Sequence, residues 1–232
     1  MVRHGQSTAN AAYAEAERTG STEPLPGLGS EVPLSEPGRA QARALGAWLA
    51  GISGDGSDDR SGDGNGHDGG RGPDLVVCSP YVRARQTWEM MAGHPRVTVP
   101  PPFLVDERLR DREMGVFEMH PPGALRARSP EEAARRERLG DWFYRPPGGE
   151  ALTDVVLRVR DFVDELDRAA PGRRVLLVAH DAIAVALRLV FAGLGATPPE
   201  AVPPVPNASV SRWDGDGGRM RLGRWGDTGH LG

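Results

Sequence analysis

Apolar side chains recur along this chain with two spacings, one typical of buried strands and one typical of helices. The continuous apolar runs within 74–79 and 173–180 are rich in Val and Leu, and they predict short strands that are buried on both faces. In the segments 35–50 and 148–170, apolar residues return every three to four positions. This spacing predicts two amphipathic helices, each with one buried face.

Capping residues and short apolar stretches extend this pattern over the rest of the chain. Ser7 is placed to cap a helix that ends near Gly20, and Ser35 is placed to cap the helix that follows it. Further helices are expected at 79–93, 129–143 and 181–195, extended segments at 96–100 and 103–109, and a hairpin at 207–225. Because strands alternate with helices, the fold class is α/β, a three-layer α/β/α sandwich with a mainly parallel central sheet.

One segment, 51–73, departs from this pattern because it is nearly free of apolar side chains and dense in Gly and Asp. Such a composition predicts a disordered insertion in a single domain that spans 1–232. Its Gly-Asp runs loosely resemble the metal-binding loops of calcium proteins and metallophosphatases, but the spacing fits neither, so no metal site is expected. The segment 117–148 is expected to act as a lid.

Composition narrows the class of protein further. The chain has 232 residues and a formal net charge of −4, so no overall positive field favours nucleic acid. The single cysteine, Cys78, excludes an internal disulfide. No apolar run is long enough to span a membrane and no signal peptide is recognised, so we expect a cytoplasmic protein. All 28 basic residues are arginine, which a coding bias explains, although arginine is also well suited to phosphate.

Polar residues follow three of the predicted strands at their carboxyl ends. They are Arg3 and His4 in the first strand, Ser79 followed by Arg83 in the second, and His180 in the third. In parallel sheets these ends share one edge, where ligands bind. Two arginines and two histidines around one point repel each other unless an anion lies between them, and phosphate suits guanidinium groups best. The helix that begins near Ser7 is expected to add free N–H groups toward that anion.

Each of these residues has an ordinary structural explanation when taken alone. A lone histidine at a strand end is usually a hydrogen-bonded structural residue, and arginines on a helix are usually solvated. Their joint occurrence at three strand ends is what favours a phosphate site.

Five segments and the opening motif, in this order along the chain, resemble the histidine phosphatase superfamily in its phosphoglycerate mutase-like branch. The motif is RHGQS with Asn10, and the segments are SPYVRARQT (79–87), LRDREMGVFE (109–118), PPGGEALTDVVLRVRDF (146–162), VLLVAHDAI (175–183) and NASVSRW (207–213). The resemblance covers most of the chain.

The resemblance implies a role for individual residues. His4 would be the nucleophile that becomes phosphohistidine, and Asp111 would donate a proton to the leaving oxygen. The phosphoryl group would be bound by Arg3, Arg83 and His180, with Asn10 assisting.

The chain departs from the family pattern at three positions. Gln6 and Asp111 stand where the family usually has Glu, and Asp181 stands where it usually has Gly. Since Asp is one methylene shorter than Glu, Glu113 remains an alternative proton donor.

These observations favour a metal-independent phosphomonoesterase that acts on a small phosphorylated metabolite through a phosphohistidine, with no cofactor and no nucleic-acid or membrane partner. A phosphoglycerate mutase, and a weakly active phosphate-binding regulatory protein of the same fold, are the alternatives. A homodimer is left open.

Overall fold

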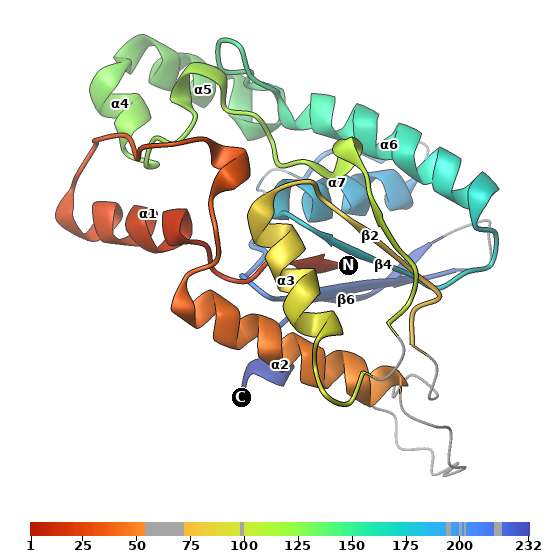
Figure 1. Ribbon diagram of the computed structural model, residues 1–232. Coiled ribbons are helices and arrows are strands. Elements are labelled where there is room, and N and C mark those ends of the chain that lie inside the picture. Colours follow the sequence, from red (N-terminus) through yellow and green to blue (C-terminus); the bar gives the residue numbers. More distant parts are fainter. Residues whose placement is uncertain (54–71, 98–99, 194–195, 200, 202, 216–219) are drawn as a thin grey trace.

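A mixed sheet forms the centre of the computed structural model, which describes residues 1–53, 72–97, 100–193, 196–199, 201, 203–215 and 220–232 (Figure 1). In this part of the chain the strand order is β3-β2-β4-β1-β5-β6. The first four of these strands are mutually parallel, and β5 and β6 add an antiparallel edge. Their bounds are β1 Val2–Arg3, β2 Leu75–Cys78, β3 Phe103–Val105, β4 Val175–Ala179, β5 Val210–Asp214 and β6 Arg221–Asp227.

Helices cover both faces of this sheet, because alternate residues of the central strands point to opposite sides. On one face, Val77 and Leu177 pack with α6 and α7. On the other face, Val76 and Leu176 pack with α2 and α3. The helices are α1 Thr8–Thr19, α2 Glu36–Ser53, α3 Val82–Ala92, α4 Ala124–Arg128, α5 Pro130–Phe143, α6 Leu152–Ala169 and α7 Asp181–Ala192. The predicted three-layer α/β sandwich is therefore confirmed.

The caps of α1 lie where the sequence predicts them. The Ser7 hydroxyl accepts a hydrogen bond from the Asn10 backbone, the Asn10 side chain in turn accepts from the Ser7 backbone, and Gly20 ends the helix in the left-handed conformation with φ 74°. Glycine adopts this conformation without the steric penalty of a Cβ atom. The predicted C-terminal hairpin also forms, since β5 and β6 pair antiparallel.

The structure differs from the predicted elements at several boundaries. α2 continues to Ser53, so the last turn of this helix includes the first three residues of the predicted insertion; residues 54–71 lie outside the described part. The prediction of an extended segment over 103–109 is wrong at its end, because Glu107–Leu109 is a 3₁₀ turn that Asp106 caps. The predicted helix at 129–143 is kinked at Gly140, whose φ of 74° is not helical.

Strand register brings the polar strand ends together. Arg3 pairs with Ala179 across β1 and β4, and Cys78 pairs with Val178 across β2 and β4. The residue after each strand therefore emerges at one edge of the sheet, beside the amino ends of α3 and α7.

Candidate active site

His4 and His180 lie against each other at this edge, as the strand ends predict. The His4 backbone N–H donates to the Ala179 carbonyl at 2.9 Å, which continues the β1–β4 pairing by one residue. The two ring centroids are 5.1 Å apart, with 62° between the ring planes. Both side chains are buried, at 2% and 0% exposure.

The hydrogen bonds of His4 fix its tautomer. Its Nδ1 lies 2.7 Å from the Gly5 carbonyl, which can only accept, so Nδ1 carries the proton. Its Nε2 is then the basic nitrogen, and it accepts from Arg83 Nε at 3.1 Å. Burial, and then the charge of Arg83, lower the pKa of His4 well below 6.5. His4 is therefore a neutral imidazole with its lone pair on Nε2.

The backbone after His4 is fixed by a close approach of α2. A Cβ atom on Gly5 would lie 2.4 Å from the Gly38 carbonyl oxygen, and one on Gly38 would lie 1.9 Å from the Gln6 carbonyl oxygen. Neither position accepts a side chain, so two glycines let the helix pack directly on this turn. The Gly5 N–H also donates to Thr87 of α3 at 3.1 Å. The orientation of His4 is therefore held by α2 and α3 together.

Arg83 connects the two sides of the site from the first turn of α3. Its Nε donates to His4, one terminal nitrogen donates to the Gly29 carbonyl at 2.6 Å, and the other pairs with Asp111 at 2.7 Å. Its side chain is only 9% exposed. The guanidinium therefore lies beside the nucleophile candidate, with all three of its nitrogens hydrogen-bonded.

His180 is held by the hydroxyl of Ser79, a residue predicted at the same edge of the sheet but without an assigned role. Its Nε2 lies 2.7 Å from the Ser79 hydroxyl, and its Nδ1 lies 3.3 Å from an Asp111 carboxylate oxygen. Burial, and then Arg83, lower the pKa of His180 well below 6.5. His180 is therefore a neutral imidazole in this site by itself, and a bound anion would raise its pKa.

Two buried nitrogens in the described part of the site make no hydrogen bond of acceptable geometry, although one of them lies 3.3 Å from an Asp111 oxygen. They are Arg3 Nε and His180 Nδ1. An unpaired buried donor is costly, and such atoms call for an explanation. Arg3 is otherwise anchored through the Val205 carbonyl and through Asp181. A phosphoryl oxygen bound beside His4 would supply the hydrogen-bond acceptor that these two nitrogens lack.

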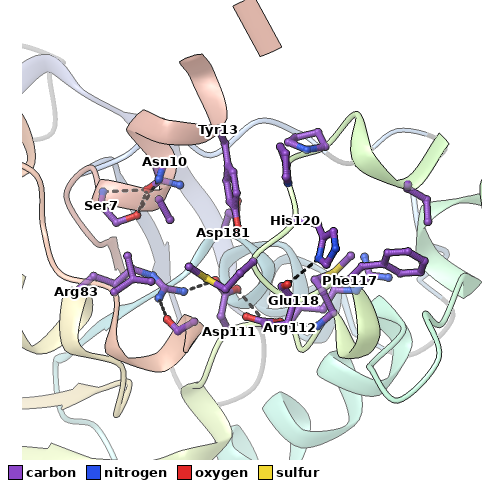
Figure 2. Close-up of a pocket in the computed structure, with 18 of the residues that line it drawn as sticks. Ser7, Asn10, Tyr13, Arg83, Asp111, Arg112, Phe117, Glu118, His120 and Asp181 are labelled. Atoms are coloured by element: carbon purple, nitrogen blue, oxygen red, sulfur yellow. Dashed lines mark hydrogen bonds and ion pairs between the residues drawn. The ribbon is translucent and has the colours of Figure 1, made fainter. Parts of the chain in front are cut away.

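A pocket of about 280 Å³ opens over these groups (Figure 2). One wall comes from α1 through Asn10 and Tyr13, and the opposite wall comes from the segment that carries Asp111 and Glu118. A larger cavity of about 680 Å³ adjoins it and shares its cationic lining. The lining common to the two cavities is Arg3, Asp111, Arg112, Met114, Arg136 and Asp181.

Comparison with known proteins identifies the family of this site. Residues 68–228, more than half of the chain, match the family model of the histidine phosphatase superfamily (branch 1). The chain belongs to this superfamily. Since that match begins at residue 68, the assignment of His4 depends on the N-terminal motif and on the geometry above.

The relatives of this histidine phosphatase superfamily member include both mutases and phosphatases. It is 31% identical over 193 residues to 2,3-bisphosphoglycerate-dependent phosphoglycerate mutase 2 of Gloeobacter violaceus, a match that covers 78% of this chain and 68% of the mutase. It is 28% identical to fructose-2,6-bisphosphatase TIGAR of Xenopus tropicalis over 72% of this chain, but it spans only 49% of that protein. These matches place it in the phosphoglycerate mutase-like branch.

Solved structures give the same result for the fold. The mycobacterial glucosyl-3-phosphoglycerate phosphatase in complex with VO3 superposes with a TM-score of 0.71 and 29% identity over 98% of each chain. Bacillus stearothermophilus YhfR superposes with a TM-score of 0.73 at 24% identity, covering all of this chain and 97% of YhfR.

The geometry separates the two candidate proton donors of this superfamily member. Asp111 lines the pocket beside Arg83 and His180. Glu113 is absent from the lining of both described cavities, and it pairs with Arg110 at 3.0 Å. Of these two carboxylates, Asp111 is therefore the one that lies in the pocket wall.

The first turn of α1 contributes less to the site than expected. The N–H groups of Ser7 and Asn10 are used by the capping box, and that of Thr8 donates to the Pro33 carbonyl. The expectation of a row of free N–H groups facing the anion is wrong, because the helix satisfies its own amino end. Asn10 does line the pocket; its amide oxygen accepts from Ser7 and Asn207, which leaves its amide nitrogen to donate.

The segment 117–148 forms part of the pocket wall, but most of its arginines do not face the pocket. Arg126, Arg128, Arg135 and Arg145 pair with Glu137, Glu23, Glu132 and Asp154. Arg136 lines both cavities, next to Arg112.

A buried ion pair that the sequence did not reveal supports the Asp111 segment. Arg158 and Glu150 are 10% and 11% exposed and 2.8 Å apart. Arg158 donates to the Asp111 carbonyl at 3.1 Å, and Glu150 accepts from the Glu113 N–H at 3.1 Å. This pair, Arg158 in α6 and Glu150 just before that helix, therefore fixes the backbone on either side of the proton donor candidate.

The lowered pKa values of the two histidines predict how stability depends on pH. In the unfolded chain each histidine takes up a proton near pH 6.5, whereas His4 and His180 stay neutral well below that pH in the folded protein. The contribution of each is complete above pH 6.5 and is lost as the pH falls toward the folded pKa, by about 1.4 kcal/mol per pH unit. Urea unfolding between about pH 7.5 and about pH 5.5 measures this dependence. In the variant His4→Ala, the free energy of unfolding should fall less steeply below pH 6.5, because its unfolded chain takes up one proton fewer. An unchanged slope would mean that His4 is protonated in the folded protein.

Proposed function

We propose that this protein is a metal-independent phosphomonoesterase that hydrolyses a small phosphorylated metabolite through a phosphohistidine on His4. The observation that carries the proposal is the neutral His4, with its basic Nε2 beside Arg83 and next to the unpartnered donors of Arg3 and His180. A nucleophile, fixed cations and a carboxyl group within one pocket are the parts that phosphoryl transfer needs.

In the first step, His4 Nε2 attacks phosphorus in line, the N–P bond forms, and the P–O bond to the alcohol breaks. Arg83, Arg3 Nε and His180 Nδ1 donate to the three equatorial oxygens, where the charge of the transition state is concentrated. To do so, Arg83 turns from His4 and Asp111 toward the phosphoryl group, which frees both the lone pair and the carboxyl group. Asp111 in its protonated form gives its proton to the departing alcohol oxygen.

In the second step, water attacks the phosphohistidine from the side that the alcohol has left. Asp111, now a carboxylate, accepts a proton from that water, the N–P bond breaks, and its electron pair returns to His4 Nε2. The products are the alcohol and inorganic phosphate. Arg3 and Arg83 supply the positive charge that a metal ion supplies in other phosphatases.

We expect turnover of an aryl phosphate in the presence of EDTA, and inhibition by vanadate, because vanadate reproduces the five-coordinate geometry of the transition state. A phosphatase screen over a panel of metabolites would then identify the substrate. Activity that disappears with EDTA and returns with a divalent cation would contradict the metal-independent mechanism. Vanadate-insensitive turnover would contradict the phosphohistidine.

A phosphoglycerate mutase is the second candidate, because two further arginines, Arg112 and Arg136, line both cavities. Burial, and then the charge of Arg136, lower the pKa of Arg112, whose guanidinium donates to the backbone carbonyls of Glu150 and Tyr144. Such a cation suits a second anionic group on the substrate. Incubation with 3-phosphoglycerate separates the two candidates: we expect phosphate release to exceed isomerisation, and the reverse ratio would establish the mutase.

A phosphate-binding regulatory protein is the third candidate. It would bind inorganic phosphate and release none from an aryl phosphate, so the same assay tests it.

A further inference from the structure

Asp181 places a second negative group in the site, on the other side from Asp111. It is the first residue of α7, directly after His180, and it lines both cavities. Figure 2 shows it between Tyr13 and the segment that carries Asp111. The proposed reaction does not use it, and a carboxylate at this position repels a phosphoryl dianion.

The ion pair of Asp181 is with one of the cations that the phosphoryl group needs. Its Oδ2 lies 3.2 Å from a terminal nitrogen of Arg3, whose side chain is 15% exposed, while that of Asp181 is 47% exposed. The other terminal nitrogen of Arg3 donates to the Val205 carbonyl. Of the three nitrogens of this guanidinium, only the buried Nε has no partner.

We propose that Asp181 is an internal competitor for Arg3, which weakens the binding of the phosphoryl dianion and so favours release of phosphate after each turnover. The effect on product release rests on the proposed function, whereas the effect on the affinity for phosphate does not. Arg3 keeps its position without Asp181, because the Val205 carbonyl still anchors it. Removing the carboxylate therefore removes repulsion and frees one more donor.

A purely local role for Asp181 is the alternative explanation. Its Oδ1 accepts from the Ala182 N–H at 2.8 Å, and an acidic residue in the first turn stabilises a helix through the helix dipole. Glu36 provides a matched control, because it is also the first residue of its helix, pairs with Arg43 at 3.7 Å, and has a side chain that is 78% exposed, away from both cavities.

The test is the binding of inorganic phosphate, measured by titration calorimetry on the full chain. We expect Asp181→Asn to lower the dissociation constant of phosphate roughly tenfold, and Asp181→Gly to lower it at least as far. Asn keeps a hydrogen-bonding group near Arg3 without the charge, so the pair of variants separates charge from contact. Glu36→Gln should leave the dissociation constant unchanged.

A double-mutant cycle tests whether the effect passes through Arg3. In an Arg3→Gln background, Asp181→Asn should improve phosphate binding much less than in the wild-type chain. Unchanged or weaker phosphate binding in Asp181→Asn would overturn the proposal. So would a loss of kcat at unchanged phosphate affinity, which would make Asp181 the proton donor. Because phosphate binding does not require turnover, a chain that hydrolyses no ester would refute the proposed function while this measurement still decides on Asp181.

Discussion

His4→Ala is expected to lose phosphatase activity by a factor on the order of 10⁴ or more, the largest effect of any single substitution in this protein. The reason is that no other side chain in the described site presents a neutral, basic nitrogen to the phosphorus atom. The alternative imidazole, His180, has its Nε2 bonded to Ser79 and lines neither described cavity. Steady-state hydrolysis of an aryl phosphate measures the effect.

His94→Ala is the matched control, because His94 lies outside both cavities and Ala keeps the Cβ that packs against Gly46. It should retain the activity of the wild type. Far-ultraviolet circular dichroism should show that His4→Ala is folded. A folded His4→Ala protein with appreciable turnover would show that the nucleophile is another group.

Arg83→Lys is expected to reduce kcat by about 10²- to 10³-fold, the second largest effect. A lysine keeps the positive charge but has a single nitrogen, so it cannot reach His4, Gly29 and Asp111 together as the planar guanidinium does. Since Arg83 is proposed to stabilise the transition state more than the bound substrate, kcat should fall more than KM rises.

The control for Arg83→Lys is Arg85→Lys, two residues further along α3. Arg85 is exposed and lines neither described cavity, so its replacement should leave both kcat and KM unchanged. If Arg83→Lys raised KM and left kcat unchanged, Arg83 would contribute only to substrate binding, and transition-state stabilisation would have to come from Arg3.

The sequence was sufficient to predict which residues meet, because their meeting depends on backbone geometry. Parallel strands place their carboxyl ends at one edge, so His4, Arg83 and His180 converge whatever the details of packing. The caps of α1 could also be predicted, because Ser7 and Gly20 begin and end this helix through hydrogen bonds within a few residues.

Interactions between distant side chains could not be predicted in the same way. Whether Arg3 faces a ligand or a carboxylate depends on where α7 begins, so its pair with Asp181 could not be predicted. The same holds for Arg158 and Glu150, which read as ordinary charges on a helix and its entry but form a buried pair behind Asp111. The protonation state of His180 likewise depends on its complete burial, which the sequence alone does not reveal.

The most direct test of the account is to identify the residue that carries the phosphoryl group during turnover. The protein would be mixed with an aryl phosphate, quenched at alkaline pH, where phosphohistidine survives, digested, and analysed by mass spectrometry. We predict a phosphoryl group on Nε2 of His4, absent in His4→Ala. Phosphorylation of any other residue, or active enzyme with no phosphoryl-enzyme under single-turnover conditions, would contradict the account.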